Sequence, residues 1–346
     1  MNRPRGKRSE RRSREEDQAR IGIIGIGHWG TNHLRVFSSL PGSRVVCAAD
    51  PKTSRHNVLK QSYPWVKFYR DYHSLLENED LDAVVVATPS SGHYAAVRDA
   101  LSAGLDVLCE KPLALTASEC QNLARRANAA RRILMVGHIL MFNPGVRKLK
   151  KYLDQGKLGK IYYIMSVRTN LGPVRPDVDV IYDLATHDIS MCNYLLGKEP
   201  LEATAVSASY LGNSKADISF ITLRYPQKIL AHFHVSWLTP PKRREVMIVG
   251  DRQIITWDDL DLMEPVRLYA IGRFEEPCYF SFGEFQKMSR DREINSPVVD
   301  SEEPLVVQNK HFLECVQKRT RPLSSANEAL AVVRALEMIK RGCGKK

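Results

Sequence analysis

Three features are missing from this sequence, and each absence excludes a class of protein. No run of about 18 apolar residues occurs, so we expect no membrane-spanning helix, and residues 1–20 contain no apolar core of a secretory signal. The cysteines are scattered singly without a CxxC pair, which argues against a disulfide framework or a zinc site. We therefore expect a soluble, cytoplasmic protein without a metal site, whose buried free thiols are Cys47, Cys109, Cys120, Cys192, Cys278, Cys315 and Cys343.

Basic side chains outnumber acidic ones, which gives a formal net charge of +12. Residues 1–20 carry eight basic and four acidic side chains and no aromatic one, so a third of the excess lies there. This composition predicts a disordered, solvated tail, and the alternative is a segment that binds nucleic acid or an acidic membrane surface. The chain of 346 residues is 43% apolar, which is enough for buried cores in two domains.

A glycine-rich turn follows the first apolar run. Residues 21–30, IGIIGIGHWG, read as a strand entering a GxGxxG turn, and a helix over 31–40 and a strand over 43–50 follow. This arrangement is typical of a dinucleotide site, where the glycines let the backbone and the helix N-terminus approach the pyrophosphate. The predicted cofactor contacts of this segment are Gly25, Gly27, His28, Trp29, Gly30 and Asp50.

Asp50 lies twenty residues after Gly30, where an acidic side chain accepts the ribose hydroxyls of the cofactor. A carboxylate there would repel the additional phosphate of NADP, so NAD is the favoured cofactor and NADP the alternative. Lys52 and Arg55 follow closely and could weaken this preference.

Strands and helices continue to alternate through residues 81–138. This alternation predicts a doubly wound parallel sheet, and ligands of such sheets bind at the carboxyl ends of the strands. The side chains expected at or just beyond such ends are Thr88, Pro89, His93, Glu110, Lys111 and His138.

Five motifs stand out together: the glycine turn, VVVATPSSGH, CEKPLAL, VGHILMFNP and DLATHDIS, and matching segments span residues 21–340. Together they resemble the Gfo/Idh/MocA family of nicotinamide-dependent sugar and cyclitol oxidoreductases. The resemblance implies a Rossmann domain over 21–141 and an α+β domain over 142–340 with a large, open, mostly antiparallel sheet that covers the nicotinamide. It also implies a homo-oligomer, a dimer or tetramer, that associates through the exposed face of this sheet.

The sequence supports a second sheet independently of the resemblance. Several segments are rich in β-branched and aromatic residues, partly with period two, and are separated by turn residues. They cover residues 160–170, 201–211, 216–225, 228–238 and 244–251.

The segment YDLATHDIS carries the residues that we expect to catalyse the reaction. In a helix, Asp183 and His187 would lie on one face, so that the carboxylate could fix the tautomer and orientation of the imidazole. His187 is then the expected base, and Lys111 would stabilise the developing alkoxide. Alternatively, Lys111 is the base if its pKa is depressed, or Asp183 and His187 only form a structural pair on a buried helix face.

The substrate is expected to contact Lys111, Asp183 and His187 and, from the flanking segment, Arg168, Asn170 and Arg175, which could bind phosphate or sugar oxygens. The alternative for the flanking residues is a solvated strand edge. Met141 stands where many family members carry arginine, which resembles the branch that oxidises nucleotide-linked N-acetyl sugars at carbon 3. The alternatives are a dehydrogenase of a free sugar or inositol and a non-catalytic, cofactor-sensing regulator.

Overall fold

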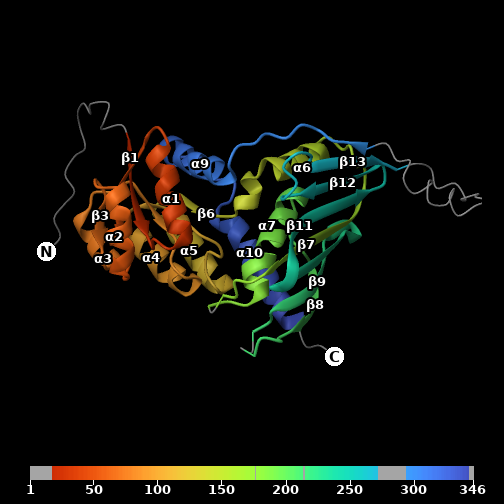
Figure 1. Cartoon of the computed structure of the whole chain (residues 1–346), viewed down its shortest axis with the longest axis horizontal. Helices are drawn as coiled ribbons and strands as arrows, with labels where there is room; N and C mark the ends of the chain where they lie inside the picture. The colour runs from red at the N-terminus through yellow and green to blue at the C-terminus, as the bar shows by residue number, and fades with distance from the viewer. Residues whose placement is uncertain (1–17, 176, 213–214, 272–293, 343–346) are drawn as a thin grey trace, which may run out of the picture.

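The computed structural model describes residues 18–175, 177–212, 215–271 and 294–342, and Figure 1 shows the arrangement of their helices and strands. Most of the predicted tail, together with Cys278 and Cys343, lies outside the described residues. The other five cysteines are free and buried, as expected.

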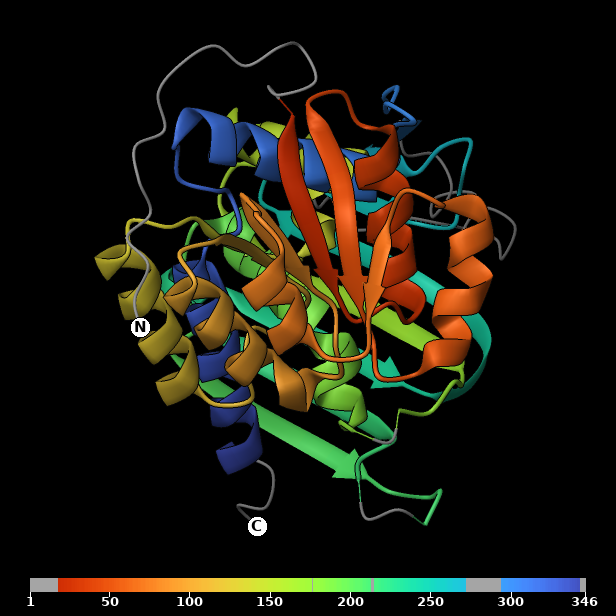
Figure 2. The same cartoon turned by 90° about the vertical axis from the view of Figure 1, so that its left-hand side faces the viewer.

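The first sheet is parallel throughout and has the strand order β3-β2-β1-β4-β5-β6 within the described residues. Its strands are β1 (Ala19–Ile24), β2 (Ser43–Ala49), β3 (Lys67–Tyr69), β4 (Ala83–Val86), β5 (Asp106–Cys109) and β6 (Leu134–Val136). The helices between them are α1 (His28–Ser39), α2 (Thr53–Ser62), α3 (Tyr72–Asn78), α4 (His93–Ser102) and α5 (Ala117–Ala129), with a 3-10 turn η1 (Ser90–Gly92). Figure 2 shows this sheet facing the viewer with helices to either side. The predicted doubly wound sheet is confirmed.

The turn between β1 and α1 requires glycine at two positions for different reasons. Gly25 has a φ of +88°, which L side chains rarely adopt. Gly30 lies in α1, where a Cβ atom would stand 1.8 Å from the carbonyl oxygen of Gly25. The helix can therefore approach the end of β1 only because residue 30 has no side chain.

The second sheet has the order β14-β13-β12-β11-β7-β10-β9-β8 and is antiparallel except for the parallel pair β7 and β10. Its strands are β7 (Ile161–Leu171), β8 (Glu202–Ala208), β9 (Ile218–Arg224), β10 (Leu230–Ser236), β11 (Leu238–Gly250), β12 (Gln253–Asp258), β13 (Val266–Ala270) and β14 (Ile294–Asn295). The five predicted strands correspond to β7 to β11. The mostly antiparallel sheet that the resemblance implied is confirmed.

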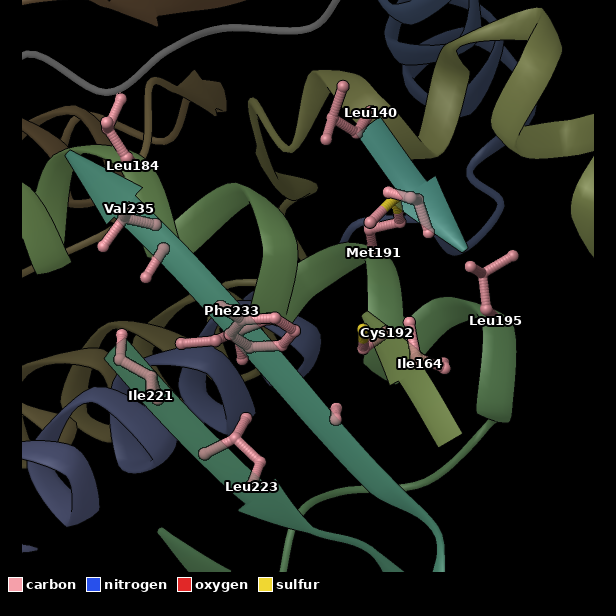
Figure 3. Packing of buried hydrophobic residues seen from close by; sticks show 14 of the residues in the cluster. Leu140, Ile164, Leu184, Met191, Cys192, Leu195, Ile221, Leu223, Phe233 and Val235 are labelled. Carbon is pink, nitrogen blue, oxygen red and sulfur yellow. The ribbon is translucent and has the colours of Figure 1, made fainter. Parts of the chain in front are cut away.

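Helix α7 (Thr186–Leu196) covers the inner face of the second sheet, preceded by one turn of π-helix, η3 (Ile181–Ala185). Figure 3 shows Ile221 of β9 and Phe233 of β10 near Met191 and Cys192 of α7, and these side chains belong to one buried cluster. The other short elements of this half are η2 (Ile139–Phe142), α6 (Pro144–Asp154) and η4 (Pro226–Lys228).

The last two helices, α9 (Pro304–Lys318) and α10 (Ala326–Gly342), return to the first sheet. Phe312 and Leu313 of α9 pack in the core beside α1. The first half of α10 contributes Ala329 and Leu330 to the core of the parallel sheet, whereas its second half contributes Leu336 to the core of the second. The boundary at residue 141 stays a prediction, and the chain crosses between the two cores more than once.

The outer face of the second sheet carries exposed apolar side chains. Tyr163, Met165, Phe220 and Leu230 are each between 39% and 45% exposed, and Val206 is 75% exposed. Association of copies through this face stays a prediction. No described helix combines the length and apolar character needed to cross a bilayer.

We expect Gly30→Ala to destabilise the protein by about 1–3 kcal/mol, because the added methyl group overlaps the Gly25 carbonyl oxygen. Gly27→Ala is the matched control, since its Cβ would meet nothing closer than 3.8 Å and its φ of −70° suits any residue. Denaturant unfolding of both variants measures the difference. Equal stabilities would contradict this account of the turn.

Candidate active site

The turn after β1 fits the pyrophosphate of a dinucleotide. Helix α1 begins at His28, and no side chain caps its first backbone N–H groups within the described residues. The side of Gly27 is open, since a Cβ there would meet only the Arg55 guanidinium, at 3.8 Å. Unpaired N–H groups at a helix N-terminus attract anions, so the predicted contacts at Gly25, Gly27, His28, Trp29 and Gly30 are sterically possible.

Asp50 directly follows β2 and is 3% exposed. Its Oδ2 accepts hydrogen bonds from the Ile26 N–H at 3.0 Å and from Arg55 Nη1 at 2.7 Å, and Oδ1 accepts from the Lys52 N–H at 2.9 Å. The carboxylate therefore also ties the glycine turn to the start of α2. Arg55, whose side chain is 40% exposed, stands beside both Asp50 and Gly27.

The loops after β4 and β5 are linked by a buried histidine. The two ring nitrogens of His93 lie 2.7 Å and 2.9 Å from the carbonyl oxygens of Pro112 and Thr88. Burial lowers the pKa of His93. With 1% exposure and both nitrogens occupied, His93 shapes the site, whereas Thr88 and Pro89 keep part of their surface exposed.

Glu110 points into the parallel domain. Its Oε1 accepts a hydrogen bond from His33 Nε2 of α1 at 2.9 Å, and both residues are buried. Burial alone would raise the pKa of Glu110, but the contact with His33 and the charge of Lys111 hold it below its usual range. The pair therefore fixes the Glu110-Lys111 loop against α1, and a direct cofactor contact of Glu110 stays a prediction.

Lys111 is 6% exposed and reaches across to η3. Its Nζ donates to the carbonyl oxygen of Asp183 at 2.7 Å and to Asp183 Oδ1 at 3.2 Å. The same carboxylate accepts from Arg175 Nη1 and from Trp237 Nε1, both at 3.3 Å. Burial alone would raise the pKa of Asp183, but the charges of Lys111 and Arg175 hold it below its usual range.

The expectation that Asp183 orients His187 is wrong. His187 lies in α7, beyond the end of the π-turn, and no hydrogen bond joins it to Asp183 among the described residues. The Asp183 carboxylate serves Lys111 instead, and His187 Nδ1 is buried without a hydrogen-bond partner among the described residues. The sequence pattern therefore predicted both residues, but it paired Asp183 with His187, whereas the structure pairs Asp183 with Lys111.

His187 remains partly exposed at the start of α7, although its Nδ1 is buried. Burial, followed by the positive charges of Lys111 and Arg168, holds its pKa well below the usual value. A role of His187 as the base stays a prediction. The imidazole is neutral at pH 7 and free to accept a proton.

The flanking polar residues differ in position. Arg168 is 2% exposed on a central strand, and its Nε lies 3.0 Å and 3.1 Å from the two carboxylate oxygens of Asp188. It is not a solvated edge residue, and its Nη2 is buried without a hydrogen-bond partner among the described residues, so a contact with the substrate stays a prediction. Asn170 donates to the Gly172 carbonyl oxygen at 2.5 Å. Arg175 is partly exposed, with Asp177 and Asp183 as partners, and a ligand could reach it.

Three participants were not predicted from the sequence. His33 hydrogen-bonds Glu110, Asp188 holds Arg168, and the Trp237 indole donates to Asp183. Asp188 lies within an apolar helical run, and a charged residue in such a run could have indicated a buried partner of opposite charge. Among the described residues, no group of three or more His, Cys, Asp or Glu side chains is arranged to hold a metal ion.

Comparison with known families agrees with this geometry. The profile of an oxidoreductase family with an NAD-binding Rossmann fold matches residues 19–138, and that of the GFO/IDH/MocA C-terminal domain matches residues 146–256. The chain belongs to the Gfo/Idh/MocA oxidoreductase family. Inositol 2-dehydrogenase 2 of Saccharopolyspora erythraea is 30% identical over 222 residues, which is 62% of this chain and 66% of that protein. The curated relatives are matched over 55% to 66% of their length.

Solved structures of this family share the whole fold. UDP-N-acetylglucosamine 3-dehydrogenase GnnA from Acidithiobacillus ferrooxidans is 23% identical, with a TM-score of 0.80 over 94% of this chain and 97% of that one. The WlbA dehydrogenase from Bordetella pertussis, in complex with NADH and UDP-GlcNAcA, is 18% identical, with a TM-score of 0.77 over 95% and 97%.

His138 gives a pH-dependent prediction. Burial, followed by the charge of Lys111, lowers its pKa to about 4 from a usual 6.5. The unfolded chain therefore binds more protons than the folded one between these values, so the free energy of unfolding falls as the pH drops from 6.5 towards 4.

We expect this residue alone to remove about 2–3 kcal/mol of stability between pH 7.5 and 4.5. His138→Phe should lose correspondingly less over the same interval, whereas His232→Phe, on the exposed outer face of β10, should behave as the unmodified protein. Chemical denaturation at both pH values measures the slopes. Identical slopes for His138→Phe and the unmodified protein would contradict the lowered pKa.

Proposed function

We propose that this protein oxidises a secondary hydroxyl group of a sugar or cyclitol with NAD. The proposal is supported above all by the contact of Lys111 with Asp183 and by the charge of Lys111 acting on His187. Lys111 follows β5 and the glycine turn follows β1, so both lie at the carboxyl ends of parallel strands. The family membership supports the same reaction class. A cofactor-sensing regulator would not need a buried lysine joined to a carboxylate beside a neutral imidazole.

The two products of the bond cleavage need different protein groups. NAD supplies the hydride acceptor when it is bound. His187, being neutral, accepts the hydroxyl proton, and the Lys111 ammonium stabilises negative charge on the substrate oxygen as the proton leaves. Asp183 acts through Lys111, whose ammonium it positions with two oxygen atoms.

As substrate we propose a nucleotide sugar, specifically a UDP-linked N-acetylhexosamine or its uronate oxidised at carbon 3. This choice is supported by the fold shared with GnnA, a UDP-N-acetylglucosamine 3-dehydrogenase, and with WlbA, whose structure holds NADH and UDP-GlcNAcA. Met141 replaces the arginine common in this family, and Arg175 is the partly exposed cation that could meet a diphosphate. Inositol is the second candidate, because the inositol dehydrogenase is closer in sequence.

We expect Lys111→Ala and His187→Ala each to lower turnover by about two or more orders of magnitude, with NAD affinity nearly unchanged. The matched controls are Lys60→Ala and His232→Ala, which change exposed residues of α2 and β10. NADH formation is measured with UDP-N-acetylglucosamine, its uronate, glucose or myo-inositol as substrate. UDP alone is then added to each reaction as a competitor. Activity with inositol and no competition by UDP would replace the nucleotide-sugar substrate by the cyclitol, and full activity of both alanine variants would refute the mechanism.

For the cofactor we propose a preference for NAD over NADP, because the buried Asp50 carboxylate occupies the end of β2. Asp50→Asn keeps an acceptor oxygen but removes the charge, so the preference should narrow by about tenfold or more. Adding Arg55→Ala should restore part of it, because Arg55 would otherwise be free to pair with the additional phosphate. Calorimetric titration of both nucleotides tests this, and tighter binding of NADP by the unmodified protein would reverse the assignment.

A further inference from the structure

A cavity of about 560 Å³ lies behind the candidate active site, between η2, α7 and the start of α10. Ser190 and Asn193 line it from α7, and His138 and Met141 line it from the end of the parallel sheet. Arg321, which is exposed, and Glu328 also line it and form an ion pair at 2.6 Å. The cavity thus runs from exposed polar side chains to a buried imidazole.

His138 has no role in the packing that would explain an imidazole. It is 1% exposed, and neither ring nitrogen has a hydrogen-bond partner among the described residues. Leaving such groups unpaired in the interior is costly, so a buried polar side chain without a protein partner points to water or a ligand in the space that it lines. Asn193 Nδ2 is a second buried donor without a described partner at this cavity.

His138 is also electrostatically close to the catalytic groups. The charge of Lys111 lowers the pKa of His138, and a charge on His138 lowers that of His187. His187 presents its buried Nδ1 to the interior, and Ser190, three residues further along α7, lines the cavity. His138 therefore borders the cavity and interacts electrostatically with Lys111 and His187.

We infer that His138 and water in this cavity carry the proton released by alcohol oxidation from His187 to the solvent. The inference rests on the proposed function. Oxidation converts the secondary alcohol and NAD⁺ into a ketone, NADH and one proton, and the electron pair leaves with the hydride. His187 takes the hydroxyl proton at its accessible ring nitrogen and releases the other proton from Nδ1. His138 accepts a proton at one nitrogen and releases one from the other to cavity water.

The dimensions and the proton affinity suit a conduit. The space exceeds many times the roughly 30 Å³ that one water molecule occupies, and polar groups line it along its length. With a pKa of about 4, His138 is protonated in about one molecule in a thousand at pH 7. His138 therefore carries a proton only transiently, and for most of the time it is neutral and is not repelled by the charge of Lys111.

The kinetic test uses the full-length protein with NAD and the substrate found above. His138→Phe should lower kcat about tenfold, at the low end of acid–base effects, and should leave KM and the Kd of NAD within twofold. Its solvent deuterium isotope effect on kcat should rise, because proton release becomes rate-limiting. Added imidazole should restore activity to His138→Ala in a dose-dependent manner. Leu323→Met, in the same cavity wall, is the control that should change none of these.

A high-resolution crystal structure supplies a readout that does not depend on turnover or on the folding of variants. We expect ordered water molecules that bind a His138 nitrogen and continue towards Arg321. A dry cavity, or full kcat with an unchanged isotope effect in His138→Phe, overturns the relay and leaves the proposed function intact. Absence of NADH formation from every sugar and cyclitol overturns both, since the proton source is then missing.

Discussion

The buried charge of Lys111 is the constraint on which the site depends. An ammonium group removed from water without a counter-charge costs several kcal/mol, so the loop after β5 and the turn at Asp183 must stay together in the folded protein. They are 72 positions apart in the chain, and the segment between them contains the edge strand β6 of the parallel sheet and the strand β7 of the second sheet. Because Asp183 also accepts from Arg175 and Trp237, one carboxylate aligns three donors from separate segments.

The glycine turn, the alternation of strands and helices, and five strands of the second sheet could be predicted because each depends on short-range patterns. The partner of Asp183 could not, since Lys111 is remote in the chain. The parallel pairing of β7 with β10 has no periodic signature either. The roles of His33 and Asp188 could not be predicted, because an apolar sequence around a polar residue indicates that the residue is buried but does not identify its partner.

The same scaffold accommodates relatives with different named substrates, so specificity must lie in few side chains. In this chain, the face that turns towards the catalytic groups is dominated by paired charges. Arg168 Nε is held by Asp188, and Arg175 is shared between two carboxylates. An anionic substrate that binds Arg175 must therefore compete with existing partners, which favours a ligand that brings more than one charge.

The return of α9 and α10 to the first sheet affects how the protein is made on the ribosome. Phe312, Leu313 and Leu330 complete the core of the N-terminal sheet, yet they are synthesised after the entire second sheet. Roughly 170 to 190 residues separate the last parallel strand from these helices, which at about 5–20 residues per second is a delay of about 10–40 seconds. During this interval the N-terminal sheet lacks the helices α9 and α10 that cover part of its apolar surface in the folded protein.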